Sequence, residues 1–204
     1  MQQAEVINIL KKDLKFSNDS IEKLKKFKGL VLKENKNYNL IGKSTESQIW
    51  NRHILDSAQL VKFIDFRLNS LADLGSGAGF PGIVIDIFNK NIDFHVKLYE
   101  KSPVKRQFLS RVIEHLDLKA KVYGDIRDEN LDTDVIVCRA FKKLDRVIQV
   151  SREIAKKPHK LLILKGQNAQ EEIKKSFKIK KYPYKLESSM TNLVSKIILI
   201  EINK

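Results

Sequence analysis

From residue 70 onward, short apolar runs alternate with amphipathic segments along the chain. This alternation predicts parallel strands joined by crossover helices. Only residues 187–192 separate the last two apolar runs, which is too short for a parallel crossover and predicts an antiparallel hairpin. The predicted fold class is therefore α/β, with a seven-stranded, mostly parallel sheet. Strands are expected near 71–75, 95–100, 120–125, 135–140, 161–165, 181–186 and 195–202, and helices near 81–90, 102–117, 144–157 and 169–177.

The first sixty or so residues show only helical periodicity. Apolar residues recur at helical spacing between 21 and 31, and either Asp19 or Ser20 can cap the helix that they predict. Farther along, the segment 45–48 (Thr-Glu-Ser-Gln) has the form of a capping box, so a further helix is expected from there to about Phe63. The amino-terminal part is predicted to be an all-helical extension.

The chain of 204 residues is long enough for one compact unit, which we divide into a helical extension (1–64) and an α/β domain (65–204). The single cysteine, Cys138, excludes an internal disulfide, and the four histidines are scattered, so no metal site is predicted. No signal sequence and no membrane-spanning apolar run is visible. We expect a cytoplasmic protein.

A net charge of +14 arises from 39 basic and 25 acidic residues. Such a surplus attracts polyanions, and nucleic acid is the obvious partner. Most of the basic residues are lysines, and a composition rich in Lys, Ile and Asn is also typical of an AT-rich genome. Charge alone leaves both explanations open.

A glycine-rich turn at 71–82 leads from the first predicted strand into a helix. Its glycines allow the backbone to approach a ligand closely, so Gly75, Gly77 and Gly79 are candidate cofactor contacts. The spacing also satisfies the dinucleotide pattern. Pro81 removes an amide hydrogen that a pyrophosphate would use, whereas S-adenosylmethionine has no phosphate to bind. Asp73, at the end of the strand, is expected to orient the methionine part of that cofactor.

Two later strand ends supply further candidate contacts for this cofactor. Glu100 follows the second strand, where its carboxylate can accept hydrogen bonds from both ribose hydroxyls. An ion pair with Lys101 or Lys105 is the alternative role of Glu100. Ile126 follows the third strand and is a candidate apolar contact for adenine, although an ordinary loop is the competing interpretation.

Four segments together resemble the small-subunit ribosomal RNA methyltransferase G family, RsmG, also called glucose-inhibited division protein B. They are 39–41 with 52–57 (Asn-Leu-Ile and Arg-His-Ile-Leu-Asp-Ser), 73–82, 138–141 (Cys-Arg-Ala-Phe) and 164–167 (Leu-Lys-Gly-Gln). The resemblance implies a Rossmann-like class I methyltransferase fold and S-adenosyl-L-methionine as the cofactor. It also implies methylation at ring nitrogen 7 of guanine 527, in the 530 loop of bacterial 16S rRNA, which is found in the small ribosomal subunit or its assembly intermediate.

The same resemblance implies that Gly75, Phe80, Ile126, Arg127 and Arg139 lie at the cofactor. The chain departs from the family pattern after the third strand. Family members commonly show a basic and then an acidic residue there, and this chain has Asp125 and Arg127. The side-chain roles at these two positions therefore stay open.

Candidate substrate residues lie in the extension and at two strand ends. Asp56 lies four positions after Arg52 and three after His53, so the three side chains can share one helix face. A buried structural network is the alternative for His53 and Asp56, whereas Arg52 and Asn39 are expected at the substrate edge. At the strand ends, Arg139 and Lys165 are expected to position RNA or cofactor. No residue is assigned as a catalytic acid or base, because nitrogen 7 carries a lone pair and no proton.

Other functions remain possible from the residues alone. Cys138 ends the fourth strand, where a nucleophile of pyrimidine methylation can lie, although Val137 and Arg139 do not match its usual neighbours. A small-molecule methyltransferase, a nicotinamide-dependent oxidoreductase and a non-catalytic RNA-binding module are the remaining alternatives.

Overall fold

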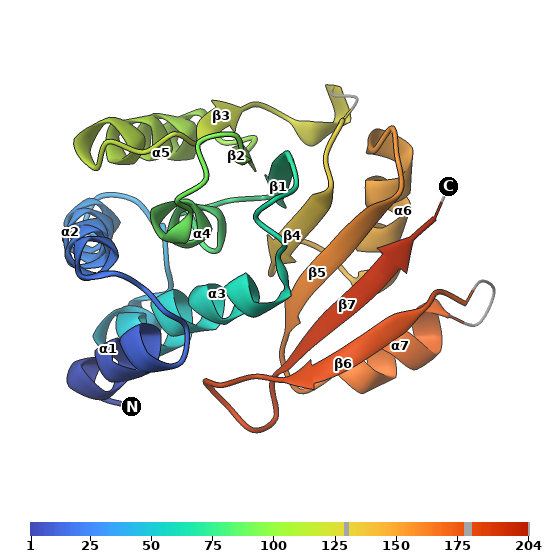
Figure 1. Cartoon of the computed structure of the whole chain (residues 1–204), viewed down its shortest axis with the longest axis horizontal. Coiled ribbons are helices and arrows are strands. Elements are labelled where there is room, and N and C mark those ends of the chain that lie inside the picture. The colour runs from blue at the N-terminus through green and yellow to red at the C-terminus, as the bar shows by residue number, and fades with distance from the viewer. Residues whose placement is uncertain (129–130, 178–180, 204) are drawn as a thin grey trace.

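The computed structural model describes residues 1–128, 131–177 and 181–203. A seven-stranded sheet of order β3-β2-β1-β4-β5-β7-β6 forms its centre (Figure 1). β7 is antiparallel to β5 and β6, and all other neighbouring strands are parallel. The predicted mostly parallel sheet is confirmed. Its strands are β1 (Ser70–Leu74), β2 (His95–Tyr99), β3 (Lys121–Tyr123), β4 (Val135–Arg139), β5 (His159–Lys165), β6 (Tyr184–Ser188) and β7 (Lys196–Ile202).

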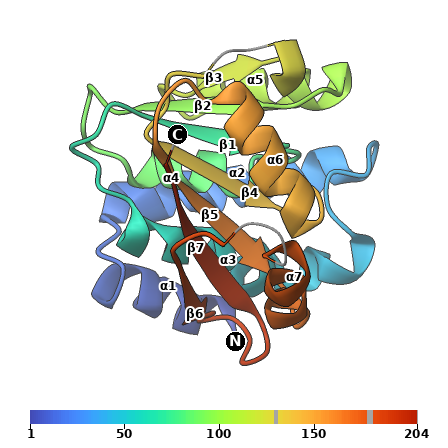
Figure 2. The same ribbon diagram turned by 90° about the vertical axis from the view of Figure 1, so that its right-hand side faces the viewer.

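Side chains alternate between the two faces of the sheet, and each face has its own core. Along β4, Val137 belongs to one buried cluster and Cys138 to the other. The helices α4 (Gly82–Phe88) and α5 (Pro103–His115) pack on the first face, and α6 (Leu144–Ile154) and α7 (Ala169–Ser176) cover the second (Figure 2). All four helices lie close to their predicted ranges.

The amino-terminal extension consists of α1 (Gln3–Lys12), α2 (Asn18–Asn35) and a run of shorter helical turns. α2 begins earlier than expected, because Ser17 is its N-cap and accepts a hydrogen bond from the Ser20 amide. The prediction of Asp19 or Ser20 as the cap was therefore wrong. The Ser20 hydroxyl instead donates to the Ile87 carbonyl at 3.0 Å and ties α2 to α4.

The segment from 43 to 63 is not one regular helix. It comprises the 3-10 turn η1 (Lys43–Gln48), the π-helical turn η2 (Trp50–Leu55), α3 (Asp56–Ala58) and the 3-10 turn η3 (Gln59–Phe63). The predicted capping box does not form, because the Thr45 hydroxyl donates to the Gly42 carbonyl and contacts His53. A π-helical turn is wider than an α-helix and is frequent at functional sites. The end near Phe63 is as expected.

The extension and the first face of the sheet share one buried cluster. Phe27 of α2 packs on Phe80 of the glycine-rich turn, with ring centroids 5.0 Å apart. α3 lies beside α4 on the same side of the sheet (Figure 1). The extension therefore supports the turn that follows β1. Within the described residues, no helix is long and apolar enough to cross a membrane.

Candidate active site

A cavity of about 870 Å³ opens at the carboxyl ends of the parallel strands. The loops after β1, β2, β3 and β4 supply most of its lining, which is the position where open α/β sheets bind ligands. Of the candidate cofactor residues, seven line this cavity and two do not. Gly75, Gly77, Phe80, Glu100, Ile126, Arg127 and Arg139 line it, whereas Asp73 and Gly79 lie behind it.

Two glycines of the turn are required for different reasons. Gly77 has a φ of +57°, and a Cβ added there would meet only the Gly75 carbonyl oxygen, at 3.8 Å, so its missing side chain leaves cavity space open. Gly79 has a φ of +96°, and a Cβ there would approach Ile83 to 2.6 Å. Gly77 therefore provides room for a ligand, and Gly79 provides close packing against α4.

Two acidic side chains hold the turn in shape. The fully buried Asp73 accepts a hydrogen bond from the Gly82 amide at 3.0 Å, and burial raises the pKa of its carboxyl to about 7. Glu100 accepts from the Gly77 and Ser102 amides, at 3.0 and 2.8 Å. No ion pair of Glu100 with Lys101 or Lys105 is found among the described residues. Because an ionised carboxylate offers about four acceptor sites, Glu100 keeps capacity for a ligand.

Apolar and charged groups lie together at the end of the cavity beyond Glu100. Ile126 is buried there, and Tyr99 stacks on Tyr123 with centroids 5.0 Å apart. Asp125 and Arg127 form an ion pair, and the hydrogen bonds from Arg127 lower the pKa of Asp125 to about 2. The departure from the family pattern thus places opposite charges where they neutralise one another at the cavity edge.

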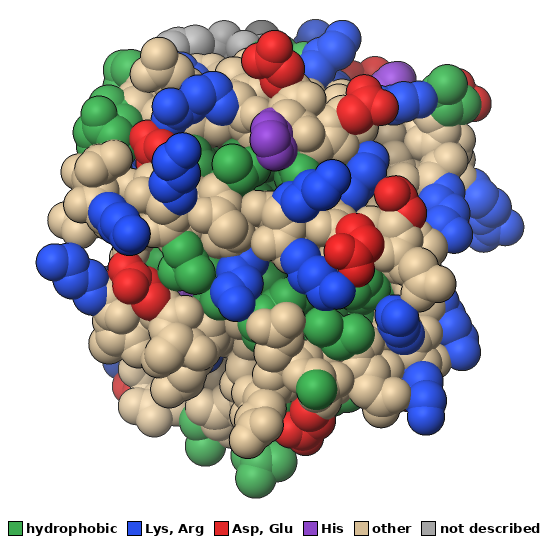
Figure 3. All heavy atoms as spheres, turned by 90° about the vertical axis from the view of Figure 1, so that its left-hand side faces the viewer, with side chains coloured by type: hydrophobic (Ala, Val, Ile, Leu, Met, Phe, Trp, Pro, Cys, Tyr) green, Lys and Arg blue, Asp and Glu red, His purple; other side chains and the backbone are tan. Residues whose placement is uncertain are grey.

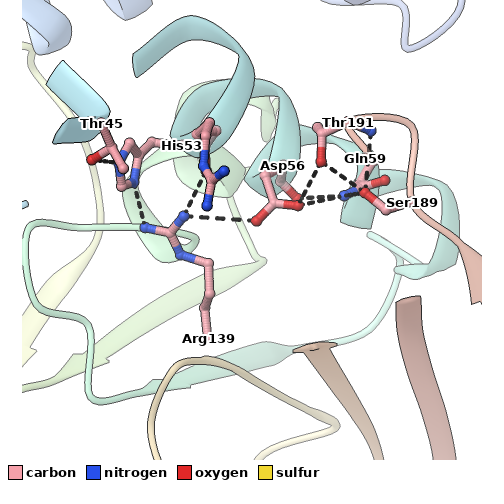
Figure 4. A network of polar contacts seen from close by, with 8 residues as sticks. Thr45, His53, Asp56, Gln59, Arg139, Ser189 and Thr191 are labelled. Carbon is pink, nitrogen blue, oxygen red and sulfur yellow. Dashed lines mark hydrogen bonds and ion pairs between the residues drawn. The ribbon is translucent and has the colours of Figure 1, made fainter. Parts of the chain in front are cut away.

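Arg139 occupies the other end of the cavity and joins the sheet to the extension (Figure 4). Its Nη1 donates to the Arg52 carbonyl at 2.9 Å, and its Nη2 lies 2.8 Å from His53 Nδ1. The guanidinium also lies over the Phe80 ring, 5.3 Å from the centroid. These contacts orient the guanidinium between the glycine-rich turn and η2.

The neighbours of His53 fix its tautomer. A guanidinium can only donate, so Nδ1 of His53 must accept, and Nε2 then carries the proton. Nε2 lies 2.8 Å from the Thr45 hydroxyl, which itself donates to the Gly42 carbonyl at 2.7 Å. Burial, together with Arg139, lowers the pKa of His53 to about 3. His53 is therefore a neutral link in a fixed chain of donors rather than a general base.

Asp56 lies on the opposite side of Arg139, with its Oδ2 3.7 Å from Nη1. Its Oδ1 accepts hydrogen bonds from Gln59 at 3.0 Å and from Thr191 at 3.3 Å. Gln59 and Thr191 also contact Ser189, as Figure 4 shows. Burial raises the pKa of Asp56, and Arg139 opposes that shift. The network thereby extends from η2 and α3 to the loop between β6 and β7.

A second cavity, of about 480 Å³, adjoins the first and shares His53, Arg139 and Ala140 with it. Arg52, Asp56 and Lys165 line only this second cavity. The structure therefore brings four of the five candidate substrate residues to one place. The fifth, Asn39, is exposed and lines neither cavity, although its neighbour Leu40 lines the first.

Lys165 and Cys138 have surroundings that limit what they can do. Lys165 Nζ bonds to the Lys142 carbonyl and to Glu172, both at 2.9 Å, which fixes the loop after β4. Cys138 is buried in the core, and burial raises the pKa of its thiol to about 12. An inaccessible thiol with so high a pKa cannot act as a nucleophile.

Several residues of the site were not predicted from the sequence. Thr45 was interpreted as a helix cap, and Thr191 lay in a stretch considered only as a hairpin turn. Tyr99 belongs to an apolar strand, and nothing in the pattern distinguishes it from core. Ser and Thr flanking a polar cluster were the only available signal, and such residues are common in turns.

Comparison with known proteins places these features in context. The model of the GidB family, described as rRNA small subunit methyltransferase G, matches residues 20–198. A ribosomal RNA small subunit methyltransferase G from Orientia tsutsugamushi (strain Ikeda) is 34% identical over 200 residues, covering 97% of this chain and 98% of the relative. The protein of the same name from Rickettsia akari is 36% identical, covering 91% and 95%.

A solved structure agrees with the fold. The SAM-dependent methyltransferase from Aquifex aeolicus superposes with a TM-score of 0.57, covering 86% of this chain and 98% of that one, at 10% identity. At this identity the likeness shows the fold alone. The predicted Rossmann-like class I methyltransferase fold is confirmed.

Proposed function

This chain belongs to the rRNA small subunit methyltransferase G family, and we propose that its target within 16S rRNA is ring nitrogen 7 of a guanine, at position 527 of the 530 loop. Methylation of small-subunit rRNA follows from the family. The choice of nitrogen 7 is supported by one observation above all. Among the residues that the structure describes, the wall shared by the two cavities consists of His53, Arg139 and Ala140, and none of these is positioned to remove a proton. His53 is held neutral there with its Nδ1 already occupied.

S-adenosylmethionine is the methyl donor, and it supplies an electrophilic methyl group on a sulfonium sulfur. The first cavity fits this cofactor, because Gly77 leaves space that any Cβ would fill. We propose that Glu100 binds the ribose hydroxyls, Ile126 contacts the adenine, and the backbone at Gly75 and Gly77 surrounds the methionine part. Asp73 supports the turn from behind rather than touching the cofactor directly.

The chemistry requires positioning and no acid or base. Nitrogen 7 uses its lone pair to form the bond to the methyl carbon as the carbon–sulfur bond breaks, and the positive charge moves to the purine. No proton leaves. The protein contributes by aligning the reacting atoms, which raises their effective concentration. Arg139 and Lys165, both cationic, are placed to hold the surrounding structure rather than the charged purine.

Covalent methylation of a pyrimidine is not supported, because Cys138 is buried and lines neither cavity. The nicotinamide alternative is not supported either, because the relatives that cover nearly the whole chain are rRNA methyltransferases. We propose that the rRNA is met in the cytoplasm, in the small ribosomal subunit or in its assembly intermediate.

This proposal is tested by transfer of labelled methyl groups to two substrates, small ribosomal subunits and naked 16S rRNA. Both are prepared from cells that lack the modification. We expect one labelled nucleotide, at position 527. Methylation at nitrogen 7 makes this guanine susceptible to reduction, after which aniline cleaves the RNA chain at that position. Gly77→Asn, which fills the first cavity, is the inactive control. A label on an exocyclic amino group, on a pyrimidine or at another position would contradict the assignment.

A further inference from the structure

We propose that the second cavity receives the target guanine ring and that Asp56 reads its N1–H and 2-amino edge. This inference rests on the proposed function and adds to it a site for the base and a residue that determines specificity. The cavity of about 480 Å³ is within the usual size of small-ligand sites. It is formed by η2, by the strand ends of β4 and β5, and by the loop between β6 and β7.

The two cavities are adjacent because His53, Arg139 and Ala140 line both. Methyl transfer needs nitrogen 7 within about 3–3.5 Å of the methyl carbon, so this atom must lie at the shared wall. The N1 and 2-amino edge lies at the other end of the purine. A guanine that presents nitrogen 7 to the first cavity therefore directs this edge into the second.

Asp56 is the acceptor that this edge requires. Guanine presents two adjacent donors there, and a carboxylate can accept both. The Asp56 side chain is 18% exposed, so the cavity can reach it. Gln59 and Thr191 bind Oδ1, whereas Oδ2 lies 3.7 Å from Arg139, longer than a normal hydrogen bond. Oδ2 thus retains acceptor capacity beside its ion pair with Arg139, and this single carboxylate oxygen can accept from both guanine donors.

A phosphate is a poorer fit to this cavity, although three cations line it. Arg139 already donates to the Arg52 carbonyl and to His53, and Lys165 is bound to Glu172. Asp56, which also lines the cavity, would repel a phosphate. The third cation, Arg52, is exposed and suits a backbone phosphate outside the cavity, whereas the charges inside favour a neutral ring with donors.

A carboxylate at this position also helps the reaction. Transfer to nitrogen 7 leaves a positive charge on the purine, which makes N1–H a stronger donor. Its hydrogen bond to Asp56 then strengthens as the reaction proceeds, and only interactions that strengthen in this way accelerate the chemical step. Asp56 would lower the barrier without taking the proton.

The rim of the cavity carries apolar side chains suited to an unstacked nucleotide. Leu193 and Val194 are 91% and 52% exposed, and they lie between Asn192 and Ser195, which line the cavity. Proteins that unstack bases place apolar side chains against the neighbouring rings. Exposed apolar groups at this rim are consistent with RNA whose target base has left the stack.

Inosine, which lacks only the 2-amino group, provides the test. Single-turnover methyl transfer is measured on 16S rRNA that carries guanosine or inosine at the target nucleotide, with the parent protein, Asp56→Asn and Asp132→Asn. The parent is expected to prefer guanosine by roughly ten- to a hundredfold, the value of one charge-assisted hydrogen bond. Asp56→Asn should slow transfer to guanosine and reduce this preference to about threefold or less.

Asp132→Asn is the matched control, since it makes the same change at an exposed carboxylate that lines neither cavity. It should keep the parental preference. Equal rates on both RNAs with the parent, an unchanged preference in Asp56→Asn, or an equal loss of preference in Asp132→Asn would each overturn the assignment. The first result needs no variant, so it holds even if Asp56→Asn fails to fold. Absence of transfer to either RNA, with S-adenosylhomocysteine still bound, would show instead that the proposed function is wrong.

Discussion

At the scale of single residues, the glycine-rich turn separates ligand space from packing. Gly77 borders open cavity, whereas Gly79 borders Ile83 and Leu109. We predict that Gly77→Asn folds but loses affinity for S-adenosylhomocysteine at least tenfold, since asparagine tolerates a positive φ and its side chain enters the cavity. Gly79→Asn should unfold or melt far below the parent. Calorimetric titration and thermal melting measure both, and parental affinity in Gly77→Asn would place the cofactor elsewhere.

Asp73 makes stability depend on pH. Its pKa rises from 3.8 in the unfolded chain to about 7 in the folded one, because burial disfavours the charge. The folded state therefore holds the proton more tightly between these values, so this residue's contribution to stability falls as pH rises from about 4 to about 7 and is constant above. The slope is at most about 1.4 kcal/mol per pH unit.

The side chain introduced by Asp73→Asn cannot ionise. As pH rises from about 4 to about 7, the free energy of unfolding of the variant should therefore increase relative to that of the parent. Urea unfolding of both proteins at several pH values measures the difference. A constant difference between pH 4 and 7 would show that Asp73 titrates normally.

At the scale of elements, Gln59 is one of the side chains of the extension that hold the hairpin loop after β6. Gln59 donates to Ser189 and accepts from the Met190 amide at 2.8 Å. We predict that Gln59→Ala costs about 1–3 kcal/mol, because it leaves buried polar groups without partners. Hydrogen exchange at the Met190 amide should accelerate by more than exchange at the Ile198 amide in β7, because the core strand opens only with the rest of the fold.

Gln48→Ala, at an exposed position of the same segment, is the control and should change neither stability nor exchange. If Gln59→Ala accelerated exchange equally in β7 and in the loop, the hairpin would open as part of global unfolding. The local connection between Gln59 of η3 and this loop would then have no independent role.

The sequence predicts an element well where local residue pattern determines its structure, and poorly where contacts with distant parts of the chain do. Periodic strands and helices follow from residue pattern. The helix expected near 102–117 was predicted closely because its starting signals, an N-cap at Ser102 and Pro103 at the first position, are local. The turns from 43 to 63 were not predicted, because His53 and Asp56 bind Arg139 some eighty residues away. Such a contact overrides the local preference for one regular helix. The candidate residues were recognisable, but their partners were not.

At the scale of the whole molecule, basic residues outnumber acidic ones by 14. Figure 3 shows basic side chains scattered, with some acidic ones between them, over the face that includes α2. The net charge of +14 attracts RNA from many directions. S-adenosylhomocysteine, by contrast, carries one ammonium and one carboxylate, so its net charge is zero and little charge is neutralised when it binds. The two binding events should therefore respond differently to salt.

We predict that RNA affinity falls steeply with salt while affinity for S-adenosylhomocysteine changes little. Each contact to a phosphate contributes about −0.7 to −0.9 to the slope of log K against log salt, so a slope of about −4 corresponds to roughly five contacts and a steeper slope to more. Two double variants separate local contacts from general attraction, because both remove two charges. Arg52→Gln with Lys105→Gln acts at the cavities, and Lys174→Gln with Lys175→Gln acts on α7. Filter binding at several salt concentrations should show a slope shallower by about one to two for the first pair and an unchanged slope for the second. Equal shifts for both pairs would mean that the RNA contacts the protein diffusely and that the cavity side carries no preferred phosphate contacts.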